Sequence, residues 1–465
     1  MRSILAILLA GISLVPPRGA SGSANQLPST FSWYVEDRFG VHLQAFYGPD
    51  GRLLAQVPVV TPSQEYIHSP RRIVRFDACR ADQSQTATYG WRIDNGPRVV
   101  AGCRYEHIFS TLGPHEVELT TTGVSGRSTS STQTIDLRDY LIVSLGDSYA
   151  SGEGNPEVRG TYAIAFPPCR QEGKVQLTTP CVQGVSQRAA WTGDACHRSS
   201  WAGPAQAALS LEREDPHSTV TFVSLACSGA TIEEGLLGRQ VNRPPDRLPQ
   251  VDALAERLCP PVAVCAGPDP QRRVDALVIS IGGNDIGFED IVKACIRLVG
   301  ACTGETIPED SPVAEARPKL ARLGLRYVEL FRAINAKLNI ASVFLTENAD
   351  AWIGEDGQFC MLRGFPLGTA IQRDDVRWLH QNVLQPLNAT ERRIAQTLGW
   401  IYVDGIADPF HGHGYCAADP WFVTYAESWA RQGDDRGTFH PNRQGHRVIA
   451  RRINEVVDQT LVRRP

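Results

Sequence analysis

The sequence predicts an α/β fold built on a doubly wound parallel sheet, preceded by a β-sandwich domain. From residue 140 onward, short apolar runs alternate with helix-like segments, and this alternation places helices on both faces of a parallel sheet. Residues 25–137 instead carry short β-rich runs separated by turn residues, which is typical of a β-sandwich. The length of 465 residues also favours two domains over one.

The α/β domain is expected over residues 138–465. Its strands are short runs of mostly apolar residues, and its helices are the longer amphipathic segments between them. The expected strands are Leu141–Leu145, Val220–Leu225, Ala276–Ile281, Ala341–Thr346 and Trp400–Val403. The expected helices are Trp201–Arg213, Leu248–Leu258, Val313–Leu338, Asp374–Leu398 and a last helix after Pro441. Residues 155–195 and 259–272 are expected to be cysteine-bearing loops.

The β-rich segment has runs such as Ile73–Phe76, Thr88–Ile93 and His115–Thr121. Over residues 62–137 it resembles a PKD-type immunoglobulin-like module, in which a Trp lies on a central strand. Trp91 fits that position, while His115 stands where the family has an aromatic corner residue. Residues 25–61 are expected to add strands or a lead-in segment, which gives a domain over residues 25–137. Such a module is either a rigid spacer or a contact for a polymer or cell surface.

The N-terminus has the pattern of a secretory signal peptide over residues 1–24. Arg2 precedes the apolar run Ile4–Ile12, and Gly22-Ser23-Ala24 is a plausible cleavage site. The run is too short to span a bilayer, and no other stretch approaches 18 apolar residues. We therefore expect a secreted, extracellular or periplasmic protein with no transmembrane segment in the mature chain.

The 12 cysteines are even in number and fit a disulfide framework in an exported protein. They lie close together in the sequence two by two, so pairing of nearest neighbours is the working hypothesis. The expected pairs are Cys79 with Cys103, Cys169 with Cys181, Cys196 with Cys227, Cys259 with Cys265, Cys295 with Cys302, and Cys360 with Cys416. No Cys-x-x-Cys occurs, which argues against a zinc ribbon or a thioredoxin-type redox site.

Composition and missing motifs exclude several function classes. A net charge of −4 gives no reason to expect a nucleic-acid partner. Neither a Gly-x-Ser-x-Gly elbow nor a phosphate-binding glycine loop occurs. The histidines at 411, 413, 440 and 446 lack a zinc-binding helix motif. We expect no metal and no cofactor, and we expect His446 to be a helix-face residue.

Four chemistry-bearing residues follow predicted strands or precede the last helix. Ser148 ends the first strand in Gly146-Asp-Ser-Tyr-Ala-Ser-Gly-Glu-Gly, Gly229 follows the second strand, and Asn284 follows the third in Gly-Gly-Asn-Asp. His440 stands just before the last helix. Because parallel strands end at one edge of a sheet, these residues are expected to meet there.

Their chemistry fits acyl transfer. A serine hydroxyl needs a neighbouring base to become a nucleophile, and His440 can serve as that base. The oxyanion that forms needs preorganised donors, which the backbone N–H groups of Ser148 and Gly229 and the amide of Asn284 can supply. Activity is then expected to rise as His440 loses its proton, near pH ~6.5.

These four blocks resemble the SGNH (GDSL) hydrolase superfamily over about residues 140–460. The resemblance implies a flavodoxin-like three-layer α/β/α domain with Ser148 as nucleophile and His440 as base. It also implies an oxyanion hole of Ser148, Gly229 and Asn284, and a structural role for Asp147. The cysteine pattern is most similar to the secreted, disulfide-containing lipase and esterase branch.

One position departs from that family. An Asp usually stands three residues before the base and orients its ring, but this chain has Gly437 there. The Gly437 carbonyl is the first candidate for this role and Asp435 is the second.

The resemblance implies a secreted serine ester hydrolase that acts on a lipid or acylated-glycan ester through an acyl-serine intermediate. Two alternatives stay open. One is an acetyl esterase acting on polysaccharide, and the other is an inactive surface-binding protein with the same fold.

Overall fold

Parallel strands form the sheet that positions the site. In the computed structural model these are β9 (Ser128–Gly146), β14 (Ser218–Ser224), β15 (Ala276–Ser280), β16 (Val343–Thr346) and β17 (Ile401–Val403). β9 has β14 on one side and β15 on the other, followed by β16 and β17, and every pairing is parallel. The spatial order 2-1-3-4-5 is the flavodoxin-like order, so the predicted fold class is confirmed.

The structure describes residues 30–462 with short gaps. The gaps are residues 48–51, 63, 69–70, 80–85, 172–173, 178, 242–247, 262, 298–301, 303–306, 308, 364 and 366–369. The predicted signal peptide, residues 1–24, lies outside the described residues.

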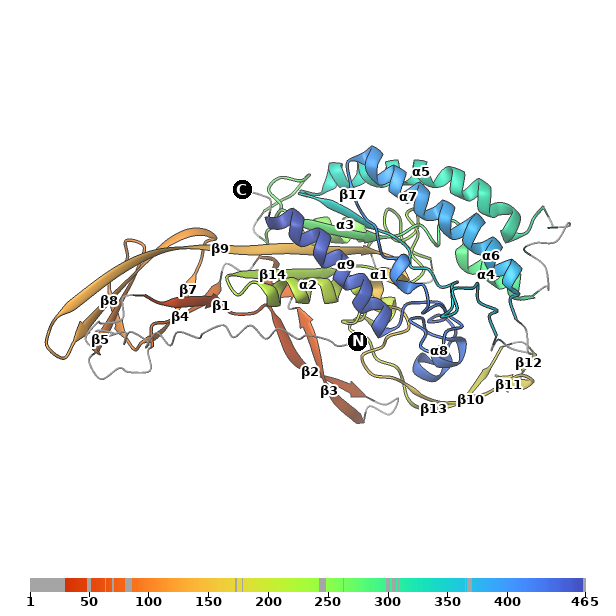
Figure 1. Cartoon of the computed structure of the whole chain (residues 1–465), viewed down its shortest axis with the longest axis horizontal. Helices are drawn as coiled ribbons and strands as arrows, with labels where there is room; N and C mark the ends of the chain where they lie inside the picture. The colour runs from red at the N-terminus through yellow and green to blue at the C-terminus, as the bar shows by residue number, and fades with distance from the viewer. Residues whose placement is uncertain are drawn as a thin grey trace, which may run out of the picture. The chain divides into compact units, whose positions relative to one another are not determined.

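Two layers of helices cover the sheet (Figure 1). α2 (Gly203–Glu214) packs against α9 (Arg443–Val462) on one face. On the other, α5 (Pro312–Lys337) packs against α3 (Gln250–Leu258) and α7 (Gln385–Leu398). β14 and β15 are buried along nearly all of their length, as expected for strands covered on both faces.

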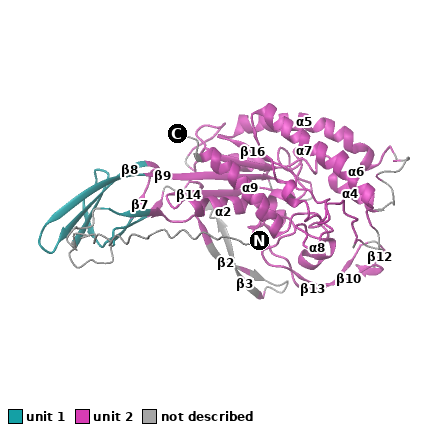
Figure 2. Cartoon of the chain, viewed as in Figure 1, with its two compact units in different colours: residues 1–33, 75–106, 114–135 teal, residues 34–74, 107–113, 136–465 magenta. Residues whose placement is uncertain are grey.

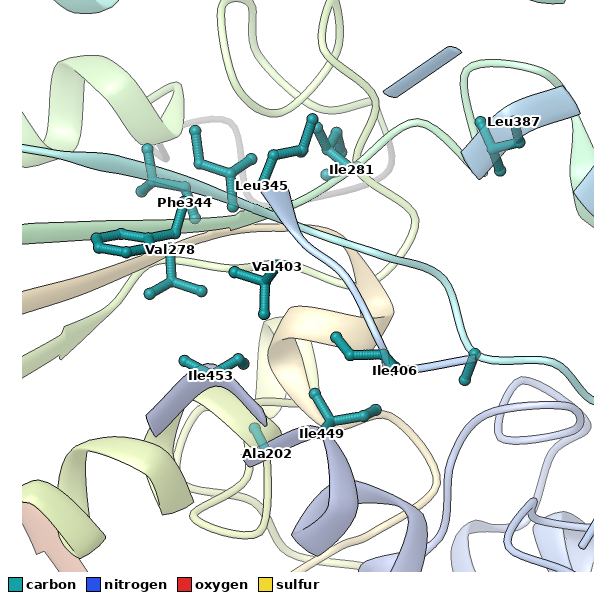
Figure 3. Close-up of a cluster of buried hydrophobic side chains, with 14 of the residues drawn as sticks. Ala202, Val278, Ile281, Phe344, Leu345, Leu387, Val403, Ile406, Ile449 and Ile453 are labelled. Carbon is teal, nitrogen blue, oxygen red and sulfur yellow. The ribbon is translucent and has the colours of Figure 1, made fainter. Parts of the chain in front are cut away.

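The core between these layers is mostly apolar. Figure 3 shows Val278, Phe344 and Val403 of the strands close to Ile449 and Ile453 of α9. All five side chains are buried. Burial of such side chains contributes roughly 1.5–3 kcal/mol each, so this layer contact is a main source of the unit's stability.

Most predicted helices are present, and the structure adds others. The predicted helix Asp374–Leu398 is two α-helices, α6 (Arg373–Leu379) and α7, joined by a π-helical turn at His380–Leu384. α1 (Ser148–Ser151), α4 (Phe288–Arg297) and α8 (Tyr425–Gln432) were not predicted. α8 begins with a capping box between Thr424 and Glu427, a pattern of Thr followed three residues later by Glu.

The prediction of a plain loop at residues 155–195 is wrong. The segment forms antiparallel pairs, β10 (Thr161–Ala165) with β13 (Cys181–Gln187) and β11 (Cys169–Gln171) with β12 (Lys174–Gln176). A disulfide between Cys169 and Cys181 closes this segment.

All six predicted cysteine pairs are disulfides in the structure, so the nearest-neighbour hypothesis agrees with it at every cysteine. The shortest of these links closes a sequence separation of 6 residues and the longest a separation of 56. The bonds join Cys79 to Cys103, Cys169 to Cys181, Cys196 to Cys227, Cys259 to Cys265, Cys295 to Cys302, and Cys360 to Cys416.

The chain divides into two compact units (Figure 2). In the smaller unit, β5 (Thr86–Ile93) pairs antiparallel with β8 (Gly113–Gly123) and β6 (Val99–Ala101). Trp91 of β5 is fully buried and contacts Phe76 and Tyr105. Of the described residues, the smaller unit takes in 30–33 and those within 75–106 and 114–135. The module over residues 25–137 and its PKD-like identity stay predictions.

Residues 34–74 group with the larger unit. This segment includes the antiparallel pair β2 (Phe39–Tyr47) and β3 (Leu53–Pro62). Arg72 of β4 (Arg72–Asp77) reaches the buried Asp139 carboxylate at 3.1 Å, and Arg272 reaches it at 3.2 Å. Arg38 lies 3.9 Å from the same oxygen. This buried ion cluster connects the N-terminal segment to β9.

Candidate active site

The predicted nucleophile follows a forced turn at the end of β9. Gly146 has φ of 137°, and a Cβ there would lie 2.0 Å from the Ser280 carbonyl oxygen, so only glycine fits. Asp147 then caps α1, because its carboxylate accepts the Tyr149 N–H at 3.0 Å. Burial raises the pKa of Asp147 to about 7. Ser148 is the first residue of α1 and is 9% exposed.

The predicted oxyanion donors lie on two neighbouring loops. Gly229 has φ of 79°, which favours glycine, and among the described residues only the Gln240 side chain comes within 4 Å of a Cβ built there. The Asn284 amide donates to the Ala230 carbonyl at 2.9 Å. A primary amide has two N–H hydrogens, so one stays available for a ligand. Ser148, Gly229 and Asn284 line one cavity.

The predicted base is presented by a strained turn. Phe439, just before His440, has φ of 64°, a left-handed conformation that costs energy for a non-glycine residue. Hydrogen bonds hold the turn, since Phe439 N–H donates to Val423 O at 3.1 Å and Val423 N–H donates to His440 O at 2.8 Å. The Tyr149 hydroxyl donates to Phe439 O at 3.0 Å. His440 lines the same cavity as Ser148.

A backbone carbonyl lies nearest to the His440 ring. Its Nδ1 is 3.2 Å from the Thr438 carbonyl oxygen, whereas the Gly437 carbonyl accepts the His440 backbone N–H at 3.1 Å. The Thr438 carbonyl is therefore within hydrogen-bonding distance of the ring, and the predicted Gly437 carbonyl also favours the charged ring. The orienting role of Gly437 stays a prediction. Asp435 lines the cavity. Within the described ranges, its carboxylate accepts no hydrogen bond from His440.

Burial dominates the electrostatics of His440. It lowers the pKa of the ring below the ordinary value of 6.5, and the Glu153 charge and the Thr438 carbonyl oppose this shift. The neutral imidazole is the form that can accept a proton. The site therefore favours the basic form of His440 at neutral pH.

A cavity of about 830 Å³ extends from these polar residues. One wall is α4, on which Phe288, Val292 and Ile296 are spaced four residues apart and so share one helix face. Trp352 and Leu387 add further apolar surface. The cavity lining thus combines the polar residues of the site with apolar side chains of α4, Trp352 and Leu387, which we call the apolar arm of the cavity.

Glu153 is a site residue that sequence reasoning missed. Its carboxylate is fully buried, and both oxygens lie 2.9 Å from His197 Nδ1. Burial alone would raise the pKa of Glu153, but His197, the nearby His440 charge and the Ser228 hydroxyl bring it down to about 2. The only sequence signal was an acidic residue between two glycines in the Ser148 block. His197 pairs with this carboxylate.

The other histidines have structural partners. His446 is fully buried on α9, as expected for a helix-face residue, and its Nδ1 accepts the Gly203 N–H at 3.1 Å. Burial lowers its pKa to about 3. His411 contacts Asp350 at 3.0 Å, and His413 stacks on Trp421. A search of the described residues finds no group of three or more acidic, His or Cys side chains arranged to hold a metal ion. Nor does any helix in the described ranges have the length and apolarity needed to cross a membrane.

Similar solved structures include a lipase, a phospholipase and an aryl esterase. The extracellular lipase of Streptomyces rimosus is 19% identical with a TM-score of 0.41, and covers 68% of this chain and 99% of its own. Phospholipase A1 of Streptomyces albidoflavus NA297 is 21% identical with a TM-score of 0.39, and covers 68% of this chain and 98% of its own. An aryl esterase of M. smegmatis is 11% identical with a TM-score of 0.29, covering 69% and 99%. A search of curated proteins finds no match.

The family assignment rests on the sequence of the α/β unit. The model of the GDSL-like Lipase/Acylhydrolase family matches residues 144–448, which is more than half of the chain. This range contains Ser148, Gly229, Asn284 and His440. The chain therefore belongs to the GDSL-like lipase/acylhydrolase family and is a carboxylic ester hydrolase of the SGNH type.

Proposed function

We propose that the protein is an exported serine esterase that prefers esters of medium or long acyl chains. Ser148 is the nucleophile, His440 is the general base, and the Ser148 and Gly229 N–H groups with the Asn284 amide form the oxyanion hole. The observation that carries the acyl preference is the apolar arm of the cavity beside these residues. The six disulfides support export.

The reaction proceeds in two acyl transfers. The Ser148 hydroxyl adds to the ester carbonyl while His440 takes its proton, and the oxyanion accepts hydrogen bonds from the three donors. His440 then protonates the leaving alcohol as the acyl-serine forms. Water attacks the acyl-serine with His440 again as base, and proton return to Ser148 releases the carboxylic acid.

A backbone acceptor makes Ser148 and His440 a dyad. The Thr438 carbonyl accepts the proton on Nδ1, which leaves Nε2 as the basic nitrogen. A neutral carbonyl fixes the tautomer as a carboxylate would. It provides less stabilisation of the imidazolium than a negative charge.

The α4 wall argues for a chain longer than acetyl. Phe288 and Ile296 are eight residues apart, so the apolar face extends about 12 Å along the helix. An acetyl group would leave most of this surface in contact with water. Each methylene that it buries contributes about 0.8 kcal/mol, which favours longer acyl chains.

The test measures hydrolysis of a set of esters by the full chain and by its Ser148→Ala variant. The set contains p-nitrophenyl acetate, octanoate and palmitate, phosphatidylcholine, and acetylated xylan. We expect kcat/KM to be higher for octanoate than for acetate, and Ser148→Ala to reduce every rate to background. Preference for acetylated xylan would replace the proposal with the acetyl-esterase alternative. No turnover of any ester by the wild type would support an inactive binding protein.

A further inference from the structure

We propose that Glu153 is a positioning residue that holds the oxyanion loop and places a buried negative charge beside His440. This inference rests on the proposed function of Ser148 and His440. It assigns to Glu153, on the loop after the nucleophile, the electrostatic help that a carboxylate three residues before the base would otherwise give.

Glu153 uses both carboxylate oxygens. Oε2 accepts the Ser228 hydroxyl, and Oε1 accepts the Gln432 amide at 2.8 Å. His197 contacts both oxygens, and its ring stacks on Trp191 with centroids 4.5 Å apart. A buried carboxylate with this many donors is held in one orientation.

Through Ser228, Glu153 fixes the residue that precedes Gly229. The Ser228 N–H donates to Cys196 O at 3.2 Å, and its carbonyl accepts the Gln240 amide at 2.8 Å. Cys227, the next residue back, is disulfide-bonded to Cys196. The side chain and both backbone polar groups of Ser228 are therefore anchored. A donor held in this way needs little reorganisation when the oxyanion forms.

Helix α1 and the loop after it, which carries Glu153, contact the chain on both sides of His440. The Asn155 amide donates to Pro441 O at 2.8 Å, and the Tyr149 hydroxyl donates to Phe439 O at 3.0 Å. A Cβ at Gly154 would lie 3.3 Å from the Gly437 carbonyl oxygen, so the two backbones touch there. Glu153 thus belongs to the element that fixes the His440 turn.

Glu153 differs from the other charges near His440 in its burial. The titratable or charged groups, among the described residues, that line the cavity with His440 or act on its charge are Asp147, Tyr149 and Glu153 on or beside α1, Glu234 after the oxyanion loop, Glu289 and Lys293 on α4, Tyr425 on α8, Asp435 and Arg436 on its own loop, and His446 on α9. The Glu289 side chain is 67% exposed and is paired with Lys293, whereas that of Glu153 is 0% exposed. Solvent and salt screen an exposed charge far more than a buried one. The Glu153 charge is also the largest favourable contribution to the charged form of His440.

The test compares Glu153→Gln, which removes the charge but keeps the size, with Glu153→Asp, which keeps the charge. The acid limb is the part of the pH profile in which kcat/KM rises as His440 loses its proton. In Glu153→Gln we expect the midpoint of this limb to move to lower pH by roughly one unit. We expect kcat to fall about tenfold with little change in KM. Glu153→Asp should keep the acid limb of the wild type. Ser228→Ala should lower kcat without moving the limb, because the carboxylate stays in place.

Glu157→Gln is the matched control. Glu157 lies on the same loop and accepts hydrogen bonds from Ser199 and Ser200, so the variant should keep both the limb and kcat. An unchanged limb in folded Glu153→Gln would overturn the proposal. If Glu153→Gln does not fold, the pH midpoint on the acid side of the wild-type kcat/KM profile is measured from about 0.05 to 1 M salt. A buried charge predicts that this midpoint does not move with salt. Exposed acidic charges predict that it moves to lower pH as salt screens them.

The two proposals fail in different ways. Ester turnover that Ser148→Ala abolishes establishes the proposed function whatever Glu153 does. If no ester is turned over, NMR titration of the His440 ring in wild type and Glu153→Gln still decides the electrostatic part. Equal His440 pKa values in the two proteins would contradict it.

Discussion

The Tyr149 hydroxyl donates a hydrogen bond to the carbonyl oxygen of Phe439 at 3.0 Å. It joins the residue after the proposed nucleophile to the residue before the proposed base, although the two are 290 positions apart. The centroids of the Tyr149 and His440 rings also lie 5.3 Å apart. One side chain thus links the two halves of the dyad.

Tyr149→Phe should weaken the turn that presents His440. The variant keeps the ring but leaves the Phe439 carbonyl without this donor, so the free energy of unfolding should fall by about 1 kcal/mol. We expect kcat to fall more than KM rises, because His440 is less well placed. Urea unfolding and steady-state kinetics measure both effects. Wild-type kcat in the variant would show that the hydrogen bond does not position His440.

Val292→Trp should shorten the apolar arm of the cavity. A larger side chain on the α4 wall excludes long acyl groups but not acetyl. We expect kcat/KM for p-nitrophenyl octanoate to fall at least about tenfold relative to acetate. Leu325→Trp is the control, because Leu325 is 69% exposed on α5 and does not line the cavity. Equal losses for octanoate and acetate would place the acyl chain elsewhere.

The pH profile should reflect a buried base. Burial lowers the pKa of His440 below 6.5, and only its neutral form accepts the Ser148 proton. The rate should therefore rise with pH and reach half of its maximum below pH 6.5, at a lower pH than the sequence alone predicts. Measurement of kcat/KM for p-nitrophenyl octanoate from pH 4 to 8 tests this. A midpoint above 6.5 would mean that the surrounding carboxylates outweigh burial.

Asp139→Asn should destabilise the larger unit strongly. The substitution leaves the buried Arg72 guanidinium and the partly buried Arg272 guanidinium without the Asp139 carboxylate. Removing one partner of a buried ion pair costs about 3–5 kcal/mol. Asp136→Asn, at an exposed pair with Arg138, should cost no more than about 1 kcal/mol. Similar unfolding midpoints for the two variants in urea would contradict the anchoring role of Asp139.

Local patterns were enough to predict the sheet and the residues at its edge. Apolar runs at Leu141–Leu145 and Ala276–Ile281 identify strands β9 and β15, and strand ends in a parallel sheet meet by topology. The predicted Ser148, Gly229, Asn284 and His440 consequently line one cavity. The nearest-neighbour cysteine pairs also match the structure, and all of them except Cys360–Cys416 join cysteines no more than 31 residues apart.

Contacts distant in sequence could not be predicted in the same way. Glu153 and Gln432 are 279 positions apart, and no local pattern relates them. The turn that presents His440 contains the left-handed Phe439, an unfavourable conformation that local propensity does not predict. β9 continues for 19 residues through the predicted domain boundary at 137. The sequence did not predict one strand there, because the first half of β9 is polar and the second half is apolar, so the two halves look like separate segments.

The most direct test of the proposed function is covalent labelling of Ser148. The wild type is treated with a fluorophosphonate, residual ester hydrolysis is followed, and the modified peptide is identified by mass spectrometry. We predict that activity is lost as one fluorophosphonate attaches at Ser148, that His440→Ala labels far more slowly, and that Ser148→Ala does not label. Loss of activity with modification at another residue, or an active Ser148→Ala protein, would contradict the account.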